Sequence, residues 1–148
     1  MEKDLRAKDI AAAFETGEAD IRTYSPLGLA FVGDAVYSLI VRTMVMEKGN
    51  TPVDRLHRKV SSYARASYQS ALAAEIAEKL SEEEAEVYRR GRNAKSHAAP
   101  KNATTGDYHR STGLEALIGY LYLSGKEERI FELMKNGMEA LEGKDGLQ

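Results

Sequence analysis

The sequence from Ser25 to Gly49 reads SPLGLAFVGDAVYSLIVRTMVMEKG. Ser25 followed by Pro26 is typical of a helix start, because serine can cap free N–H groups and proline suits the first helical position. The residues that follow are almost wholly apolar, and Gly49 supplies a stop signal. We therefore expect a core helix over 26–48. One acid, Asp34, falls in its interior.

The composition suits one soluble globular domain. The chain has 148 residues, 43% hydrophobic and 30% charged. With no cysteine, it excludes disulfides and cysteine-based metal sites or nucleophiles, and this fits a reducing cytosol. The N-terminus lacks the apolar core of a signal peptide, and the apolar run from Phe31 to Val41 is interrupted by Asp34 and too short for a membrane span. We expect a cytoplasmic protein with no membrane contact.

The rest of the chain predicts further helices and no strand. Helical spacing indicates a short helix near residues 10–14, a long one from the Thr51-Pro52 cap to Leu80, and one opened by the Ser81-Glu84 capping box. Two more are expected over 111–123 and 126–141, the last with Ile130, Phe131, Met134, Met138 and Leu141 facing inward. The expected organisation is an N-terminal segment 1–24, an all-α domain 25–141 of about six or seven helices, and a flexible tail 142–148.

Two acids lie in the most apolar helices, Asp34 in one and Glu115 in the other. If the two side chains meet, both cannot be charged without a cation between them. A site made of carboxylate oxygens, with no cysteine and no histidine cluster, suits a hard ion such as Mg²⁺. Each acid has another interpretation. Asp34 could be an exposed acid on a thin polar stripe. Glu115 could cap its helix, because Thr112-x-x-Glu115 matches a capping box.

A basic segment from Arg89 to Lys101 contains no acid, and its Gly, Asn, Ser and Pro residues indicate a loop. It is either a solvated turn or a surface that binds phosphate and sugar oxygens. The candidate RNA-binding residues are Arg90, Arg92, Asn93, Lys95, Ser96 and Lys101, followed by His109 and Arg110.

Three motifs in order resemble the ribonuclease III family. Residues 28–37, GLAFVGDAVY, are similar to its signature helix, and residues 112–119, TGLEALIG, to its second acidic motif. Residues 90–96, RGRNAKS, with Pro100-Lys101-Asn102, are similar to the short branch called mini-ribonuclease III.

This resemblance implies a homodimeric, all-helical endonuclease fold that cleaves double-stranded RNA with Mg²⁺, for which Mn²⁺ could substitute. It implies that Asp34 and Glu115 are the catalytic metal ligands and that a double-stranded-RNA-binding domain is absent. The short branch matures the ends of 23S ribosomal RNA precursors, and a large-subunit ribosomal protein stimulates it. We expect the same substrate and partners here.

The chain departs from the longer relatives at two positions. Ala30 and Thr112 stand where those relatives usually have acids, so two of the usual four carboxylates remain. The number of metal ions is therefore open. The reduced set also leaves an alternative function, that of a catalytically inactive RNA-binding or ribosome-assembly protein on the same fold.

Overall fold

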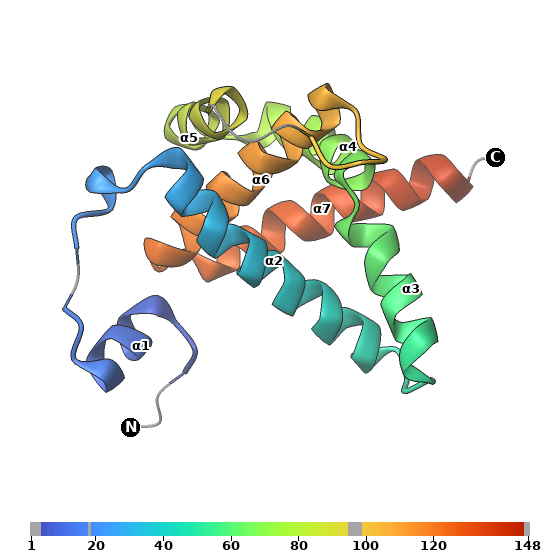
Figure 1. Ribbon diagram of the computed structural model, residues 1–148, viewed down its shortest axis with the longest axis horizontal. Coiled ribbons are helices and arrows are strands. Elements are labelled where there is room, and N and C mark those ends of the chain that lie inside the picture. Colours follow the sequence, from blue (N-terminus) through green and yellow to red (C-terminus); the bar gives the residue numbers. More distant parts are fainter. Residues whose placement is uncertain (1–3, 18, 95–98, 147–148) are drawn as a thin grey trace.

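The computed structural model describes residues 4–17, 19–94 and 99–146, and within them it contains seven α-helices, two short 3-10 helices and no strand (Figure 1). The elements are α1 (Ala7–Phe14), η1 (Ile21–Thr23), α2 (Pro26–Glu47), α3 (Val53–Ala64), α4 (Ala66–Ile76), η2 (Ala77–Lys79), α5 (Glu82–Asn93), α6 (Thr105–Leu123) and α7 (Glu127–Gly146). The predicted all-α fold and number of helices are confirmed.

The core is built on α2 and α6, which cross near the middle of the molecule (Figure 1). Nearly every residue of α6 from Ser111 to Leu121 is buried, and α4, α5 and α7 pack around this helix. An apolar helix with contacts on several sides needs no polar stripe, which explains why α6 shows little amphipathic pattern.

Helix α2 begins and ends as predicted. The Ser25 hydroxyl accepts a hydrogen bond from the Gly28 N–H, Pro26 occupies the first turn, and Gly49 adopts a positive φ just after the helix. The whole helix α2, 22 residues with a mean hydropathy of 1.5 over an 18-residue window, is longer than the apolar run from Phe31 to Val41 and by length and composition alone could cross a membrane. Core helices of soluble proteins pass the same test, and α2 packs here against α6.

The long helix expected from Thr51 to Leu80 is two helices instead. Its first residue is Val53, and no side chain caps it, so the predicted Thr51 cap is wrong. Arg65 is extended, with φ −65° and ψ 149°, and separates α3 from α4. The Tyr37 hydroxyl donates a 2.6 Å hydrogen bond to the Tyr63 carbonyl. This long-range bond stabilises the break, since it satisfies a carbonyl in the last turn of α3.

Two further boundaries differ from the sequence prediction. Arg89 to Asn93 form the last turn of α5 rather than a loop, and the glycine among them, Gly91, is buried against α6. Helix α6 begins at Thr105, capped by the Thr104 hydroxyl, well before the expected start near Ser111.

The structure of the two ends of the chain also differs in detail from the sequence prediction. Helix α7 extends to Gly146, so part of the predicted tail is helical, and Phe131 is 55% exposed rather than inward-facing. Helix α1 lies beside the main body near the end of α6, where the Tyr122 hydroxyl donates to the Leu5 carbonyl (Figure 1).

Candidate active site

Asp34 and Glu115 line the same surface pocket, whose volume is about 400 Å³. Asp34 comes from α2 and is exposed, whereas Glu115 comes from α6 and is partly buried. The alternative prediction that the Asp34 side chain is exposed is therefore confirmed. Its position at the pocket nevertheless brings it to the second acid, as expected.

The close crossing of α2 and α6 places these acids side by side. A Cβ atom on Gly33 would lie 1.7 Å from the Glu115 carbonyl oxygen, and one on Gly119 would lie 1.9 Å from the Leu29 carbonyl oxygen. Both helices therefore need glycine at the crossing, and their backbones touch there. Because Asp34 follows Gly33 and the contact on α6 is Glu115 itself, the crossing sets the separation of the two acids.

The electrostatics of Glu115 reflect this proximity. Burial, a side-chain hydrogen bond with Asp34 and the charge of Asp34 raise the pKa of Glu115 from 4.5 to about 8, while a hydrogen bond from Gln69 opposes this rise. Among the described residues, neither acid forms an ion pair with a basic side chain. Without a cation, the pair is relieved by keeping a proton on Glu115 at neutral pH.

These two oxygen donors fit a hard divalent cation, which would take the place of that proton. Ala30 and Thr112 also line the pocket, but neither supplies a carboxylate, and the Thr112 hydroxyl donates to the Tyr108 carbonyl at 3.0 Å. Over the described part of the chain, no group of three or more Asp, Glu, His or Cys side chains is placed to hold a metal. Within those residues, the site therefore offers two acids and no third.

The capping interpretation of Glu115 is wrong. Because α6 begins at Thr105, Thr112 and Glu115 lie in its interior, where N–H groups bond to carbonyls four residues earlier. The capping-box pattern gave a false signal, and Glu115 has no helix terminus to cap.

The predicted RNA-binding residues lie on two neighbouring helices and the connection between them. Arg90, Arg92 and Asn93 are exposed on α5, Lys101 is exposed in the connection, and His109 and Arg110 are on α6. Lys95 and Ser96 lie outside the described residues.

The structure brings part of this set together around Tyr88. The Arg92 guanidinium lies over the Tyr88 ring, 5.9 Å from its centroid. Burial raises the pKa of Tyr88, and the nearby charges of Arg92 and Arg110 partly offset this rise. A Cβ on Gly91 would lie 2.6 Å from the Cβ of Ala116, the residue after Glu115. The basic end of α5 is therefore held at a fixed place relative to the acids.

Sequence reasoning missed Gln69. This residue is buried on α4, lines the same pocket and lies close enough to Glu115 to lower its pKa by hydrogen bonding. No local pattern marks it, because its position depends on the break between α3 and α4.

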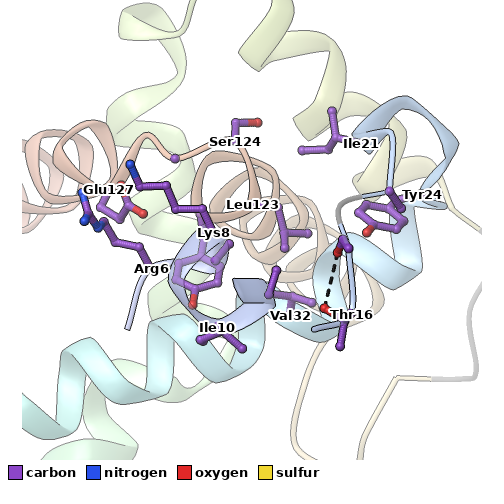
Figure 2. Close-up of a pocket in the computed structure, with 16 residues that line it drawn as sticks. Arg6, Lys8, Ile10, Thr16, Ile21, Tyr24, Val32, Leu123, Ser124 and Glu127 are labelled. Carbon is purple, nitrogen blue, oxygen red and sulfur yellow. Dashed lines mark hydrogen bonds between the residues drawn. The ribbon is translucent and has the colours of Figure 1, made fainter. Parts of the chain in front are cut away.

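A second hollow, of about 650 Å³, lies between the N-terminal segment and the turn from α6 to α7 (Figure 2). Its labelled side chains include Arg6, Lys8, Tyr24 and Glu127, and it contains neither acid of the first pocket. The chemistry predicted from the sequence therefore belongs to the pocket between α2, α4 and α6.

Comparison with known proteins gives a consistent result. Residues 27–126 match the Ribonuclease III domain family. The chain is similar to Mini-ribonuclease 3 of Symbiobacterium thermophilum, with 45% identity over 81% of this chain and 92% of the relative. It is also similar to Mini-ribonuclease 3 of Streptococcus pneumoniae, with 40% identity over 84% of this chain and 98% of the relative.

A solved structure agrees with the fold. A crystal structure of a Fusobacterium nucleatum protein superposes with a TM-score of 0.74 and 36% identity, over 80% of this chain and 96% of that one. The matched family covers both acids, and the relatives are covered almost end to end. The chain therefore belongs to the ribonuclease III family of endonuclease domains, in the branch named mini-ribonuclease 3.

Proposed function

We propose that this protein is a divalent-metal-dependent endoribonuclease that hydrolyses double-stranded RNA, with Asp34 and Glu115 as its metal ligands. One observation carries the proposal. The glycine-mediated crossing of α2 and α6 brings two carboxyl groups, with no basic partner among the described residues, into one pocket of a ribonuclease III family chain.

The roles of the residues follow from their chemistry. Asp34 and Glu115 would hold the cation, Mg²⁺ or in its place Mn²⁺. When bound, such a cation makes water a better nucleophile near neutral pH and offsets the negative charge that develops on the phosphate. Because Ala30 and Thr112 bring no charge, these two acids supply the negative charge that the pocket presents to the cation.

The basic end of α5, the connection to α6 and the first turns of α6 would bind the RNA backbone. A-form RNA presents its phosphates and 2′-hydroxyls in a shallow minor groove, so recognition would depend mainly on duplex shape and on ionic strength. The proposed contacts are Arg90, Arg92, Asn93, Lys95, Ser96, Lys101, His109 and Arg110.

The proposed biological role follows the short branch of the family. The substrate would be the precursor of 23S ribosomal RNA, cleaved near its ends in the cytoplasm, and a large-subunit ribosomal protein would stimulate the reaction by shaping that RNA. These assignments, like the homodimer, remain predictions.

An apolar surface on α2 supports the proposed homodimer. Phe31 is 82% exposed, and Leu27, Leu39 and Met46 are exposed on the same helix. Phe31 also lines the pocket of the acids, so a partner subunit packed on this surface would lie next to the site. Large exposed apolar residues on one element are typical of an interface.

Asp34→Asn tests the proposed function directly. We expect wild-type protein to cleave duplex RNA in Mg²⁺, and Asp34→Asn to lose more than the 10–100-fold typical of residues that only support a ligand. Asp54→Asn, which alters an exposed acid of α3, is the matched control and should cleave at the wild-type rate.

The measurement is the rate of product formation under single-turnover conditions. Equal rates for wild type and Asp34→Asn would contradict the role of Asp34. Duplex binding without cleavage by wild type, in either metal, would favour the inactive RNA-binding alternative.

A further inference from the structure

Gln69 is a buried polar residue with a specific contact to the site. Its exposed fraction is 3%, it lines the pocket together with Asp34 and Glu115, and its side-chain amide is close enough to the Glu115 carboxyl to lower the pKa of that group by hydrogen bonding. A buried amide is almost always hydrogen-bonded, and losing that bond leaves an unsatisfied polar group. The contact between Gln69 and Glu115 therefore has an energetic consequence for both side chains.

The backbone is bent in a way that delivers Gln69 to this place. Ala64 ends α3 and Ala66 begins α4, and both line the pocket on either side of the extended Arg65. Gln69 lies one turn into α4, and its N–H bonds to the Arg65 carbonyl. A continuous helix through this region would have sent residue 69 in another direction, so the break positions Gln69 over Glu115.

The chemistry of the contact gives Gln69 a distinct task. An amide N–H that donates to a carboxylate fixes the plane of the carboxylate and favours its charged form. Glu115 has few other constraints, because Ala30 and Thr112 supply no further acids and no basic side chain of the described chain pairs with it.

We propose that Gln69 is a positioning residue, which orients the Glu115 carboxylate toward the shared space with Asp34 where a divalent cation would bind. The inference rests on the proposed function for the identity of the ion and of the reaction. The geometry of Gln69 itself is independent of that function.

The experiment compares three variants of the full chain. Gln69→Met keeps the length of the side chain but removes the donor, and Gln69→Asn keeps the amide but withdraws it by one methylene. Ser70→Ala is the matched control: Ser70 is the neighbouring buried polar residue of α4, 7% exposed, and does not line the pocket. Calorimetry measures Mn²⁺ affinity without RNA, and cleavage kinetics on duplex RNA give kcat and KM.

We expect both Gln69 variants to bind Mn²⁺ about 10–100-fold more weakly than wild type and to lose a similar factor in kcat with KM unchanged. Ser70→Ala should match wild type in both measurements. If Gln69→Met does not fold, Gln69→Asn decides the outcome. Wild-type metal affinity in a folded Gln69 variant, or an equal loss in Ser70→Ala, would overturn the proposal.

The two proposals can fail separately. A wild-type protein that binds Mn²⁺ in a Gln69-dependent way but cleaves no RNA would support the role of Gln69 and contradict the proposed function. Cleavage that depends on Asp34 but not on Gln69 would do the reverse.

Discussion

At the scale of single residues, the protonation of the Glu115 carboxyl group is subject to opposing influences. Burial and the neighbouring Asp34 disfavour its charged form, while the Gln69 amide favours it, and the balance raises its pKa to about 8. In the metal-free protein, Glu115 therefore keeps its proton at neutral pH. A bound cation would reverse this preference, since its positive charge stabilises both carboxylates.

This pKa predicts a pH-dependent stability for the metal-free protein. An unfolded Glu115 loses its proton near its ordinary pKa of 4.5, whereas the folded one keeps it up to about pH 8. The folded state binds more protons in this window, so the free energy of unfolding should fall as pH rises from about 4.5 to about 8, by at most about 1.4 kcal/mol per unit. Partial solvent access of Glu115 will make the observed slope smaller.

Glu115→Gln isolates this contribution, because the amide does not titrate. The measurement is denaturant unfolding of both proteins in EDTA, between pH 5 and pH 9. The stability of wild type relative to Glu115→Gln should decrease across the window and become constant above it. A difference that does not change with pH would show that Glu115 titrates normally in the folded protein.

At the scale of elements, the crossing of α2 and α6 depends on two glycines that let the backbones touch. Gly33 meets the Glu115 carbonyl and Gly119 meets the Leu29 carbonyl, so the contact is reciprocal. Gly33 is therefore not available for contact with a second subunit, because its face is occupied by α6 of the same chain.

Gly33→Ala should therefore damage both stability and the site. Its Cβ would fall 1.7 Å from a backbone oxygen, which cannot move aside as a flexible side chain can. We expect a loss of about 3 kcal/mol or more in the free energy of unfolding, at the upper end of overpacking effects. In the fraction that folds, the separation of Asp34 and Glu115 should change and RNA cleavage should fall.

Gly143→Ala is the control for this prediction. Gly143 lies in α7, and a Cβ atom added there would have no neighbouring atom within 4 Å, so alanine should be neutral or stabilise by up to about 1 kcal/mol. Denaturant unfolding measures both variants. A Gly33→Ala protein as stable as wild type would mean that the helices do not touch at this point.

At the scale of the whole molecule, α2 has two roles on its two sides. One side is buried against α6, and the other carries Phe31, Leu39 and Met46 at the surface. This explains why the apolar residues of α2 are not confined to one face of the helix. The excess over what one core requires motivates the proposed homodimer.

Phe31→Arg tests that interface. We expect wild type to have twice the 16.3 kDa mass of one chain, and Phe31→Arg to be monomeric, because a charge would be buried at the contact. Phe14→Arg, at an exposed phenylalanine of α1, should remain dimeric. Sedimentation at micromolar concentration gives the masses. A monomeric wild type, or a dimer lost only in Phe14→Arg, would contradict this interface.

Local signals were accurate where the cause of a structure lies within a few residues. The Ser25-Pro26 start of α2 and the Ser81-Glu84 capping box of α5 are both confirmed, since a cap is made by neighbours along the chain. The Thr112-Glu115 capping pattern was wrong because a local pattern shows only where a helix could start. Packing against the rest of the molecule determines that α6 already begins at Thr105.

The sequence by itself determined the all-α class and the core helix with Asp34, and its family motifs marked Asp34 and Glu115 as the candidate acids, because apolar periodicity and motifs are written in the order of residues. Only the tertiary structure decided the backbone contact of Gly33 with α6, the break at Arg65 and the arrival of Gln69 beside Glu115. Each of these depends on atoms from helices far apart in the chain, such as the Tyr37 hydroxyl on the Tyr63 carbonyl. Such contacts leave no local pattern, since either partner alone would be compatible with a different fold.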